Sequence, residues 1–220
     1  TFKKWWPASF HLIGKDILTT HAVYWPTMLM SIGIELPKSI FAHGWWLMSD
    51  SKMSKSLGNV INPMDLIKNY GVDPVRYYLM REMVLGQDSN FTIESFIQRY
   101  NSDLANDFGN LLSRVSTLMK KNYDGKIPEM GEFTDAEATI KSHGESMGEI
   151  VNEKIKAMRL NEAIEEIMQY IRSVNKYMEN NAPWKLVKED KVAAGRVLYT
   201  AGEALRISAV LLSPVMPNRT

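Results

Sequence analysis

The sequence predicts an α/β fold class for its first part, in the form of half of an α/β domain, followed by an all-α helix bundle. A strand–helix–strand pattern occupies the residues up to 48 and makes one parallel crossover unit. Beyond residue 90 the apolar residues recur at helical spacing. Between these parts, the polar run Gly86-Gln87-Asp88-Ser89-Asn90 is typical of a loop and marks the best domain boundary.

Composition restricts the class of protein. The chain has 220 residues, of which 45% are hydrophobic and 23% charged, as in globular proteins. Its formal net charge is +1, so a contact with nucleic acid would need a local basic patch. The absence of cysteine excludes disulfides and cysteine-ligated zinc within this stretch. No apolar run reaches the length of a membrane span, so we expect no membrane partner.

The first predicted strand is the apolar run 10–13, which is typical of a buried parallel strand. Gly14 and Asp16 follow it directly, at the position where many nucleotide-binding folds contact a ribose. An equally good interpretation is that Asp16 caps the next helix.

That helix is predicted over residues 16–31. Ile17, His21 and Tyr24 are four and three residues apart, so they share one face. From the pattern alone, a histidine in this position is more often a structural residue than a ligand.

The second strand is predicted over residues 39–47, with His43 and Gly44 where it ends. For Trp45 and Trp46 the simplest interpretation is core packing.

A basic loop follows, Lys52-Met53-Ser54-Lys55-Ser56, and continues into Leu57-Gly58-Asn59. Two ammonium groups and several hydroxyl donors on a loop suit the binding of a polyphosphate while negative charge shifts on it. The alternative is a solvated loop with scattered lysines. Asn62 and Pro63 then give the cap and first residue of a helix, which is the context that a phosphate-binding loop requires.

Two short helices are predicted next. The first begins at Pro63 and ends at Gly71, a residue favoured at helix C-termini. The second begins with Asp73-Pro74 and runs to about Leu85.

The rest of the chain is predicted to form an antiparallel bundle of four long helices. The first opens at Thr92, ends at Asn122-Tyr123-Asp124-Gly125, and carries the apolar stripe Ile93, Ile97, Tyr100, Leu104, Phe108, Leu111, Val115 and Leu118. The second covers roughly 135–157. The third carries Leu160, Ile164, Ile167, Ile171, Val174 and Met178, and the fourth Leu198, Ala201, Leu205, Ala209 and Leu212.

Two features of the bundle bear on RNA. Asn110 and Arg114 are one turn apart and project together beside the stripe. Trp184 follows Pro183 in a predicted break between helices. An amide, a guanidinium and an indole can read and stack single-stranded bases. The alternative is an ordinary helix surface with a buried loop tryptophan, which the residues by themselves favour.

The basic loop spells the KMSKS signature of class I aminoacyl-tRNA synthetases, and the chain as a whole resembles the methionyl-tRNA synthetase family. The motifs that carry the resemblance cover essentially the whole chain: Phe10-His11-Leu12-Ile13-Gly14-Lys15-Asp16-Ile17, His21, Tyr24-Trp25-Pro26, His43-Gly44-Trp45-Trp46, Asn110-Leu111-Leu112-Ser113-Arg114 and Ala182-Pro183-Trp184. The resemblance implies the second half of a class I Rossmann-like catalytic domain over 1–48, the KMSKS loop and stem-contact fold over 49–90, and a helical anticodon-binding domain over 91–220.

The resemblance also implies roles for individual residues. The catalytic residues would be Lys55, which stabilises the migrating pyrophosphate charge, and Lys52, which assists it. The ATP site would comprise Lys52, Met53, Ser54, Lys55, Ser56, Gly14, Asp16, His11, His43, Gly44 and Trp46. The methionine pocket would be lined by Ile17, His21 and Tyr24. The CAU anticodon would be read by Asn110, Arg114, Pro183 and Trp184.

The implied activity is that of a cytoplasmic methionine–tRNA ligase, with tRNA(Met), methionine and ATP with Mg²⁺ as its partners and substrates. Some members of the family carry a zinc knuckle, but this stretch offers no thiolates for one. The chain starts without an initiator methionine, at Thr1. We therefore expect an internal piece whose N-terminal half, with the family's histidine signature, lies upstream.

Two rival functions remain at this point. One is another class I ligase for an apolar amino acid, which would share the lysine signature but should lack the His21/Tyr24 and Asn110/Arg114/Trp184 sets. The other is a non-catalytic RNA-binding module, which adenylate formation by the full-length parent would rule out.

Overall fold

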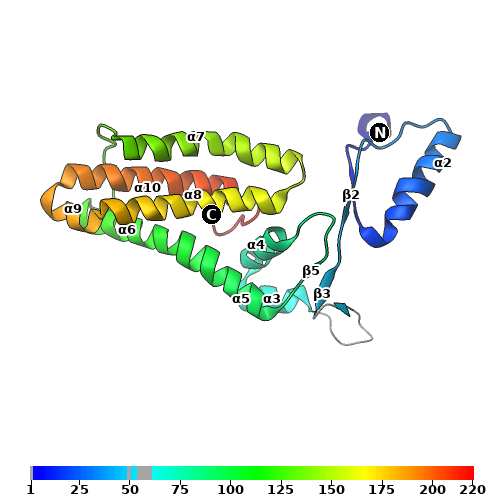
Figure 1. The fold of residues 1–220 in the computed structure, drawn as a ribbon, viewed down its shortest axis with the longest axis horizontal. Helices are drawn as coiled ribbons and strands as arrows, with labels where there is room; N and C mark the ends of the chain where they lie inside the picture. The colour runs from blue at the N-terminus through cyan, green and yellow to red at the C-terminus, as the bar shows by residue number, and fades with distance from the viewer. Residues whose placement is uncertain (1, 49–50, 54–60) are drawn as a thin grey trace. The chain divides into compact units, whose positions relative to one another are not determined.

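The computed structural model describes residues 2–48, 51–53 and 61–220 (Figure 1). The chain divides into two compact units. The first comprises Thr1–Ile61 and Glu82–Thr92, and the second comprises Asn62–Arg81 and Ile93–Thr220. The polar run predicted as a boundary, 86–90, thus lies in a segment that returns to the first unit.

The first unit contains the predicted parallel crossover. After the short helix α1 (Phe2–Trp5), strand β1 (His11–Gly14) pairs in parallel with β2 (Ile40–His43). The register places Gly14 opposite His43. Because parallel strands end at the same edge of a sheet, the residues that follow both strands lie close together.

The connection between these strands is helical, but it is not the uniform α-helix that the sequence predicts. It comprises a 3₁₀ turn η1 (Lys15–Ile17), a π-helix η2 (Thr20–Tyr24) and the α-helix α2 (Trp25–Ser31). Pro26 explains the wide turn that precedes it, because proline lacks an N–H and its ring clashes with the carbonyl four residues back in an α-helix.

The predicted single strand 39–47 is wrong, because the chain changes sheet at Gly44. Strand β3 (Trp46–Met48) belongs to a second sheet, in which it pairs antiparallel with β4 (Ser51–Lys52) and parallel with β5 (Ser89–Asn90). The main chain of Gln87 approaches Gly44 so closely that any Cβ there would collide with the Gln87 carbonyl. A glycine at this position therefore allows the crossover between sheets.

The second unit begins with the two predicted short helices. Helix α3 (Pro63–Tyr70) starts where the Asn62 side chain accepts a hydrogen bond from the Met64 N–H at 3.0 Å. It ends at Gly71, whose φ of 89° lies in the region that favours glycine. Helix α4 (Val72–Glu82) follows and is shorter than predicted.

The long helix after Thr92 has three parts: α5 (Ile93–Arg99), the π-helix η4 (Tyr100–Gly109) and α6 (Asn110–Asn122). The predicted stripe is correct for Leu111 and Val115, which are buried. It is wrong for three other members, since Ile93, Ile97 and Tyr100 are 37–39% exposed. An α-helical period does not hold across a π segment, so the inward face changes.

The bundle is completed by α7 (Asp135–Lys156), α8 (Leu160–Asn181), α9 (Pro183–Glu189) and α10 (Lys191–Leu212). Helices α7, α8 and α10 lie side by side, with α8 antiparallel to the other two (Figure 1). One apolar cluster fills the space between them and α6, and its fully buried members include Met147, Met168, Val174, Met178, Leu198, Ala201 and Leu212. Within the part of the chain that the structure describes, we find no helix of the length and apolarity needed to cross a membrane.

One buried carboxylate is built into this core. Glu137 is 1% exposed and accepts a hydrogen bond from the Tyr177 hydroxyl at 2.5 Å. It also accepts from the Thr134 N–H at 2.8 Å and lies 3.3 Å from the Arg196 guanidinium. Because every buried charge here has a partner, the network joins α7, α8 and α10 without leaving an unpaired ion in the core.

Candidate functional site

The carboxyl ends of β1 and β2 bring three predicted nucleotide-binding residues together. An oxygen of the Asp16 carboxylate lies 2.5 Å from where a Cβ on Gly14 would stand, and the His43 ring lies 3.7 Å from the same point. Asp16 lies inside the turn η1, whose N-cap residue is Gly14, and no side chain caps this turn. Asp16 therefore does not cap this helical turn. Its carboxylate lies beside the carboxyl edge of the sheet, where parallel sheets commonly bind nucleotides.

A second cluster at this edge was not anticipated from the sequence. The Lys15 ammonium lies 2.7 and 2.6 Å from the two carboxylate oxygens of Asp88 and 4.2 Å above the centre of the Trp45 ring. Asp88 also accepts a hydrogen bond from the Trp45 N–H at 2.8 Å. These bonds, first of all the one from Lys15, hold the pKa of Asp88 below its ordinary value. The only signal in the sequence was the position of Lys15 between Gly14 and Asp16.

The predicted methionine-binding face lies on the crossover helix. The His21 ring nitrogen Nδ1 is 2.9 Å from the Ile17 carbonyl, so Nδ1 carries a proton and donates it. The other nitrogen of a neutral ring is then free to accept. The rings of His21 and His11 are 6.2 Å apart and meet edge to face, which places a β1 residue beside this helix. Ile17 and Tyr24 are 42% and 56% exposed, so the face is open.

The predicted phosphate-binding loop is described only in part. Lys52 ends strand β4, where its main chain is opposite Leu47 of β3, and Met53 follows. Ser54, Lys55 and Ser56 lie outside the described residues. Trp46 begins β3, and its ring meets that of Phe91 at 6.3 Å, which supports a packing role for this tryptophan.

In the second unit, two of the predicted base-reading residues are in direct contact. The Arg114 guanidinium lies 4.9 Å above the centre of the Trp184 ring, and the indole is 37% exposed. Asn110 is exposed one turn earlier on α6. The structure therefore presents an amide, a guanidinium and an aromatic face on one surface, which is a combination suited to unpaired bases.

The predicted local structure around Trp184 was wrong. It lies in the first turn of α9 rather than in an irregular break, and Pro183 is the buried first residue of that helix. The joint between α8 and α9 is the single residue Ala182, whose φ of 42° is left-handed. Such a sharp joint holds the indole at a fixed angle to α8, which a flexible loop would not do.

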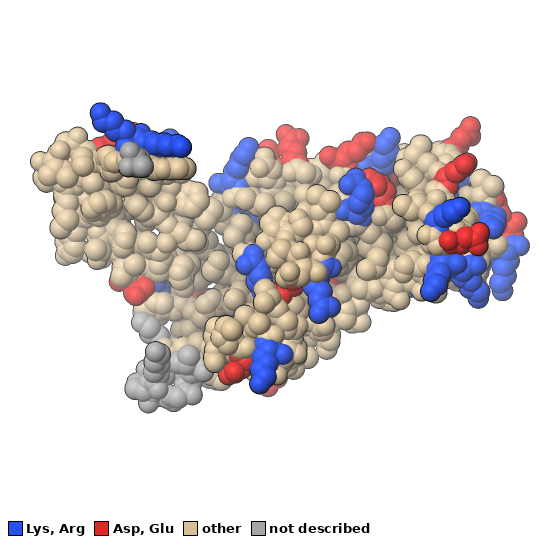
Figure 2. All heavy atoms as spheres, turned by 180° about the vertical axis from the view of Figure 1, so that it is seen from behind, with Lys and Arg blue, Asp and Glu red and all other residues tan. Residues whose placement is uncertain are grey.

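This surface lies at a basic end of the bundle. Lysines gather where α6 ends and where α9 and α10 begin, and they include Lys120, Lys121, Lys126, Lys185, Lys188 and Lys191. Figure 2 shows several blue side chains at one end of the bundle, with red ones among them. A local basic patch of this kind is what a chain with almost no net charge needs in order to bind a phosphate backbone.

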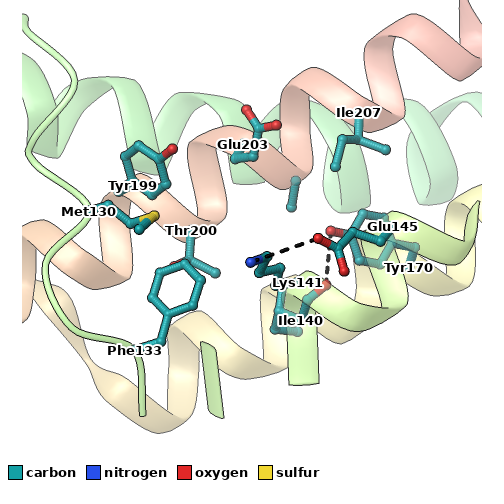
Figure 3. A pocket seen from close by; sticks show the side chains of 11 residues that line it. Met130, Phe133, Ile140, Lys141, Glu145, Tyr170, Tyr199, Thr200, Glu203 and Ile207 are labelled. Carbon is teal, nitrogen blue, oxygen red and sulfur yellow. Dashed lines mark hydrogen bonds and ion pairs between the residues drawn. The ribbon is translucent and has the colours of Figure 1, made fainter. Parts of the chain in front are cut away.

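The bundle also contains a cavity of about 170 Å³ between α7, α8 and α10 (Figure 3). Several of its polar groups already have partners in the bundle. Lys141 pairs with Glu145 at 3.8 Å, Tyr170 donates to the Ile140 carbonyl at 3.3 Å, and Glu203 binds Arg206. Burial, with the nearby Glu203 charge, raises the pKa of Tyr170 to about 12, so this phenol stays neutral. The cavity shows the features of packing rather than of a polar ligand site.

The described residues do not form a group of side chains that could bind a metal ion. Among residues 2–48, 51–53 and 61–220, no group of three or more His, Cys, Asp and Glu side chains could hold an ion.

Comparison with known proteins gives a consistent result for both units. Residues 1–116 match the family model of tRNA synthetases class I (M), and residues 127–220 match that of the anticodon binding domain of methionyl tRNA ligase. Over 99% of the chain, the sequence is 46% identical to the methionine–tRNA ligase of Mycobacterium leprae and 44% identical to that of Thermotoga maritima. The chain covers 41% and 35% of these two relatives.

The fold is also shared with solved structures. The methionyl-tRNA synthetase of Mycobacterium tuberculosis bound by methionyl-adenylate superimposes with a TM-score of 0.94 at 43% identity. The match covers 99% of this chain and 43% of that one. An unbound form of the same enzyme gives a TM-score of 0.90. With a class I synthetase stretch followed by a helical anticodon-binding domain, the chain belongs to the class I tRNA synthetase family of the methionyl type.

Proposed function

We propose that this chain is part of a methionine–tRNA ligase, in which it supplies one side of the active site and the domain that reads the anticodon. The observation that carries the proposal is the match of 99% of the chain to a synthetase solved with methionyl-adenylate, at a TM-score of 0.94. The chain spans about two fifths of that protein, so the activity of the whole enzyme is part of the proposal.

In the proposed reaction, methionine and ATP form methionyl-adenylate with release of pyrophosphate, and the methionyl group then passes to the terminal ribose of tRNA(Met). ATP enters as its magnesium complex, a substrate rather than a resident metal. Lys55, assisted by Lys52, stabilises the charge that accumulates on the leaving pyrophosphate. Ser54, Ser56 and Met53 shape the loop that carries them.

The edge formed by β1 and β2 would contact the nucleoside part of ATP. The missing side chain of Gly14 leaves space for the Asp16 carboxylate, which can accept hydrogen bonds from ribose hydroxyls. His11, His43, Gly44 and Trp46 complete this side. The unanticipated ion pair between Lys15 and Asp88 fixes the position of the strand ends and of the segment that returns to them.

The open face of the crossover helix would hold the methionine side chain. A thioether is apolar, polarizable and a weak acceptor. Ile17 and Tyr24 provide an apolar wall, and His21 is oriented by its bond to the Ile17 carbonyl. A histidine held this way places one adjustable polar group against an otherwise apolar ligand.

The helical domain would read the CAU anticodon. Trp184 offers a face on which a base can stack, Arg114 covers part of that face, and Asn110 supplies an amide for base edges. Pro183 fixes the start of α9 and so the place of Trp184. The nearby lysines would bind the phosphates, and the enzyme would work in the cytoplasm, where its tRNA is found.

Methionine-dependent ATP–pyrophosphate exchange tests the catalytic part of the proposal. The 220-residue chain should show no exchange by itself, because Lys52 and Lys55 are only one side of the site. An N-terminal half taken from a relative, added in trans or fused, should restore exchange. Robust exchange by the chain alone would contradict this assignment of residues to the site.

The rival function, a non-catalytic RNA-binding module, predicts a different result. Such a module would bind RNA but would show no exchange in any combination with an N-terminal half. Exchange in the fused protein together with discrimination of the CAU anticodon would exclude it.

A further inference from the structure

The base-reading residues follow directly on an unusual helical segment. The π-helix η4 spans ten residues, Tyr100–Gly109, whereas most π-helices are single turns, which are frequent at functional sites. The N–H of Asn110 still donates to the carbonyl of Ala105, five residues back. A Cβ on Gly109 would stand 2.9 Å from the Leu104 carbonyl oxygen, so the last π turn tolerates only a glycine without adjustment.

A π-helix has about one residue more per turn than an α-helix, so each residue rotates less about the helix axis. Over a segment of this length, the side-chain directions differ by about half a turn from those of a continuous α-helix. This rotation separates two faces of one continuous helix. Before the segment, Phe96 packs against the rings of Tyr70 and Tyr78, at 4.9 and 5.4 Å. After it, Leu111 and Val115 enter the bundle core, which leaves Asn110 and Arg114 to face outward.

Helix α8 holds the last turn of η4 at one residue. The side-chain amide of Asn175 donates to the main-chain carbonyl of Asp107 at 2.9 Å. The Arg172 guanidinium lies 3.3 Å from the Asp107 carboxylate and is itself held by Glu165 at 2.5 Å. Asp107 is thus fixed through both its main chain and its side chain, three residues before Asn110.

These contacts have a larger effect on the orientation of η4 than on the stability of the fold. The side chains of Asp107 and Arg172 are 28% and 39% exposed, and ion pairs that exposed stabilise a fold little. Their geometric effect is larger, since a small rotation of η4 displaces every side chain of the first turns of α6.

We propose that Asp107, Arg172 and Asn175 are positioning residues for anticodon reading, and that they lock the π-helical frame that aims Asn110 and Arg114 at the bases. This inference rests on the proposed role of Asn110, Arg114 and Trp184. It adds that the specificity of the site depends on residues that do not touch RNA.

Two matched pairs of variants test the inference. Gly109→Ala places a Cβ against the Leu104 carbonyl, while Gly148→Ala adds the same methyl on α7 where nothing lies within 4 Å. Asn175→Leu removes the donor to Asp107, while Ser173→Ala removes a hydroxyl that bonds only within α8. Arg172→Ala, on the surface, provides a further variant that should fold normally.

The measurement is the ratio of dissociation constants for two anticodon stem-loop RNAs, one with CAU and one with a changed first anticodon base. We expect Gly109→Ala and Asn175→Leu to lower this ratio about tenfold and Arg172→Ala about threefold. Gly148→Ala and Ser173→Ala should retain the wild-type ratio. Circular dichroism of each variant identifies any that fails to fold.

The outcomes separate the inference from the function on which it rests. A wild-type chain that binds both RNAs equally would overturn the anticodon-reading function itself. A wild-type chain that discriminates, with folded Arg172→Ala and Asn175→Leu variants that discriminate equally well, would overturn the positioning role alone.

Discussion

The two units of this chain differ in how much of their apolar surface they bury. In the helical unit, buried side chains such as Met147, Met168, Val174 and Leu198 form one cluster, each at 0% exposure. In the first unit, large apolar side chains stay open to solvent, and they include Phe10, Leu12, Met28, Met30 and Ile32 at 50–66% exposure. The helical unit thus has a core of its own, whereas the strand unit lacks the surfaces that would cover it.

This difference explains how the proposed tasks are divided. A unit with a closed core can present Asn110, Arg114 and Trp184 on a rigid surface. A two-stranded sheet with an open apolar face has surface for further packing, and the chain covers 41% of the relative from Mycobacterium leprae. Changes in the first unit should therefore affect adenylate formation, and changes in the second should affect stability and tRNA recognition.

The largest effect is expected from Lys55→Ala in the full-length enzyme. Loss of one donor that acts on charge in the transition state costs about 2.7–4 kcal/mol, or a hundred- to thousandfold in rate. Methionine-dependent pyrophosphate exchange measures it. Lys141→Ala, in the other unit, is the matched control and should leave exchange unchanged. An exchange rate within a fewfold of wild type for Lys55→Ala would remove this lysine from the mechanism.

Glu137→Gln should weaken the helical unit by about 3 kcal/mol in urea unfolding at neutral pH, because it leaves Arg196 without its buried partner. Glu145→Gln, on the exposed side of the same helix, should change the free energy of unfolding little.

The effect of Glu137 should depend on pH. Burial by itself would raise the pKa of Glu137, but hydrogen bonds from Thr134 and Tyr177 and the Arg196 charge outweigh it and hold the pKa below the ordinary value. The stabilisation is therefore complete above the pKa of a glutamate in the unfolded chain, about 4.3, and is lost as the pH falls through the lower folded value. Acidification should narrow the gap between wild type and Glu137→Gln, and a constant gap would contradict the prediction.

Trp184→Ala and Arg114→Ala should each weaken the binding of CAU-containing tRNA by about 1–3 kcal/mol, which is the cost of a lost stacked base or base-reading arginine. In the full-length enzyme, pyrophosphate exchange by these variants should stay at the wild-type level. Val192→Ala, 74% exposed on α10, serves as the control for binding. If the variants discriminate against a changed first anticodon base as well as wild type does, these residues do not read the anticodon.

The smallest effect is expected from His21→Ala and Tyr24→Ala. Each variant removes part of an exposed wall, so methionine binding should weaken by about 1 kcal/mol. The KM for methionine should therefore rise roughly fivefold. The KM for ATP should not change. Met30→Ala, 66% exposed on the same connection, is the control. A change confined to the ATP parameter would mean that this helix face was assigned to the wrong substrate.

Local chemistry was sufficient to predict much of this molecule. Asn62 with Pro63, Gly71, and the apolar period of α8 specify helix ends and a buried face through interactions within a few residues. The order of strand, helix and strand likewise specifies a parallel pair, because a crossover connection permits little else. The proposed site residues were found by their resemblance to a family, not by these rules.

What only the tertiary structure decided involves residues far apart in the chain. The switch of sheets at Gly44 depends on Gln87, and the ion pair of Lys15 depends on Asp88. The last turn of the π segment before Asn110 is bonded to α8 through Asn175, 68 residues away from Asp107. Sequence periodicity assumes a constant helical pitch and near neighbours, so it could not reveal a π-helical segment or its contacts with a distant helix.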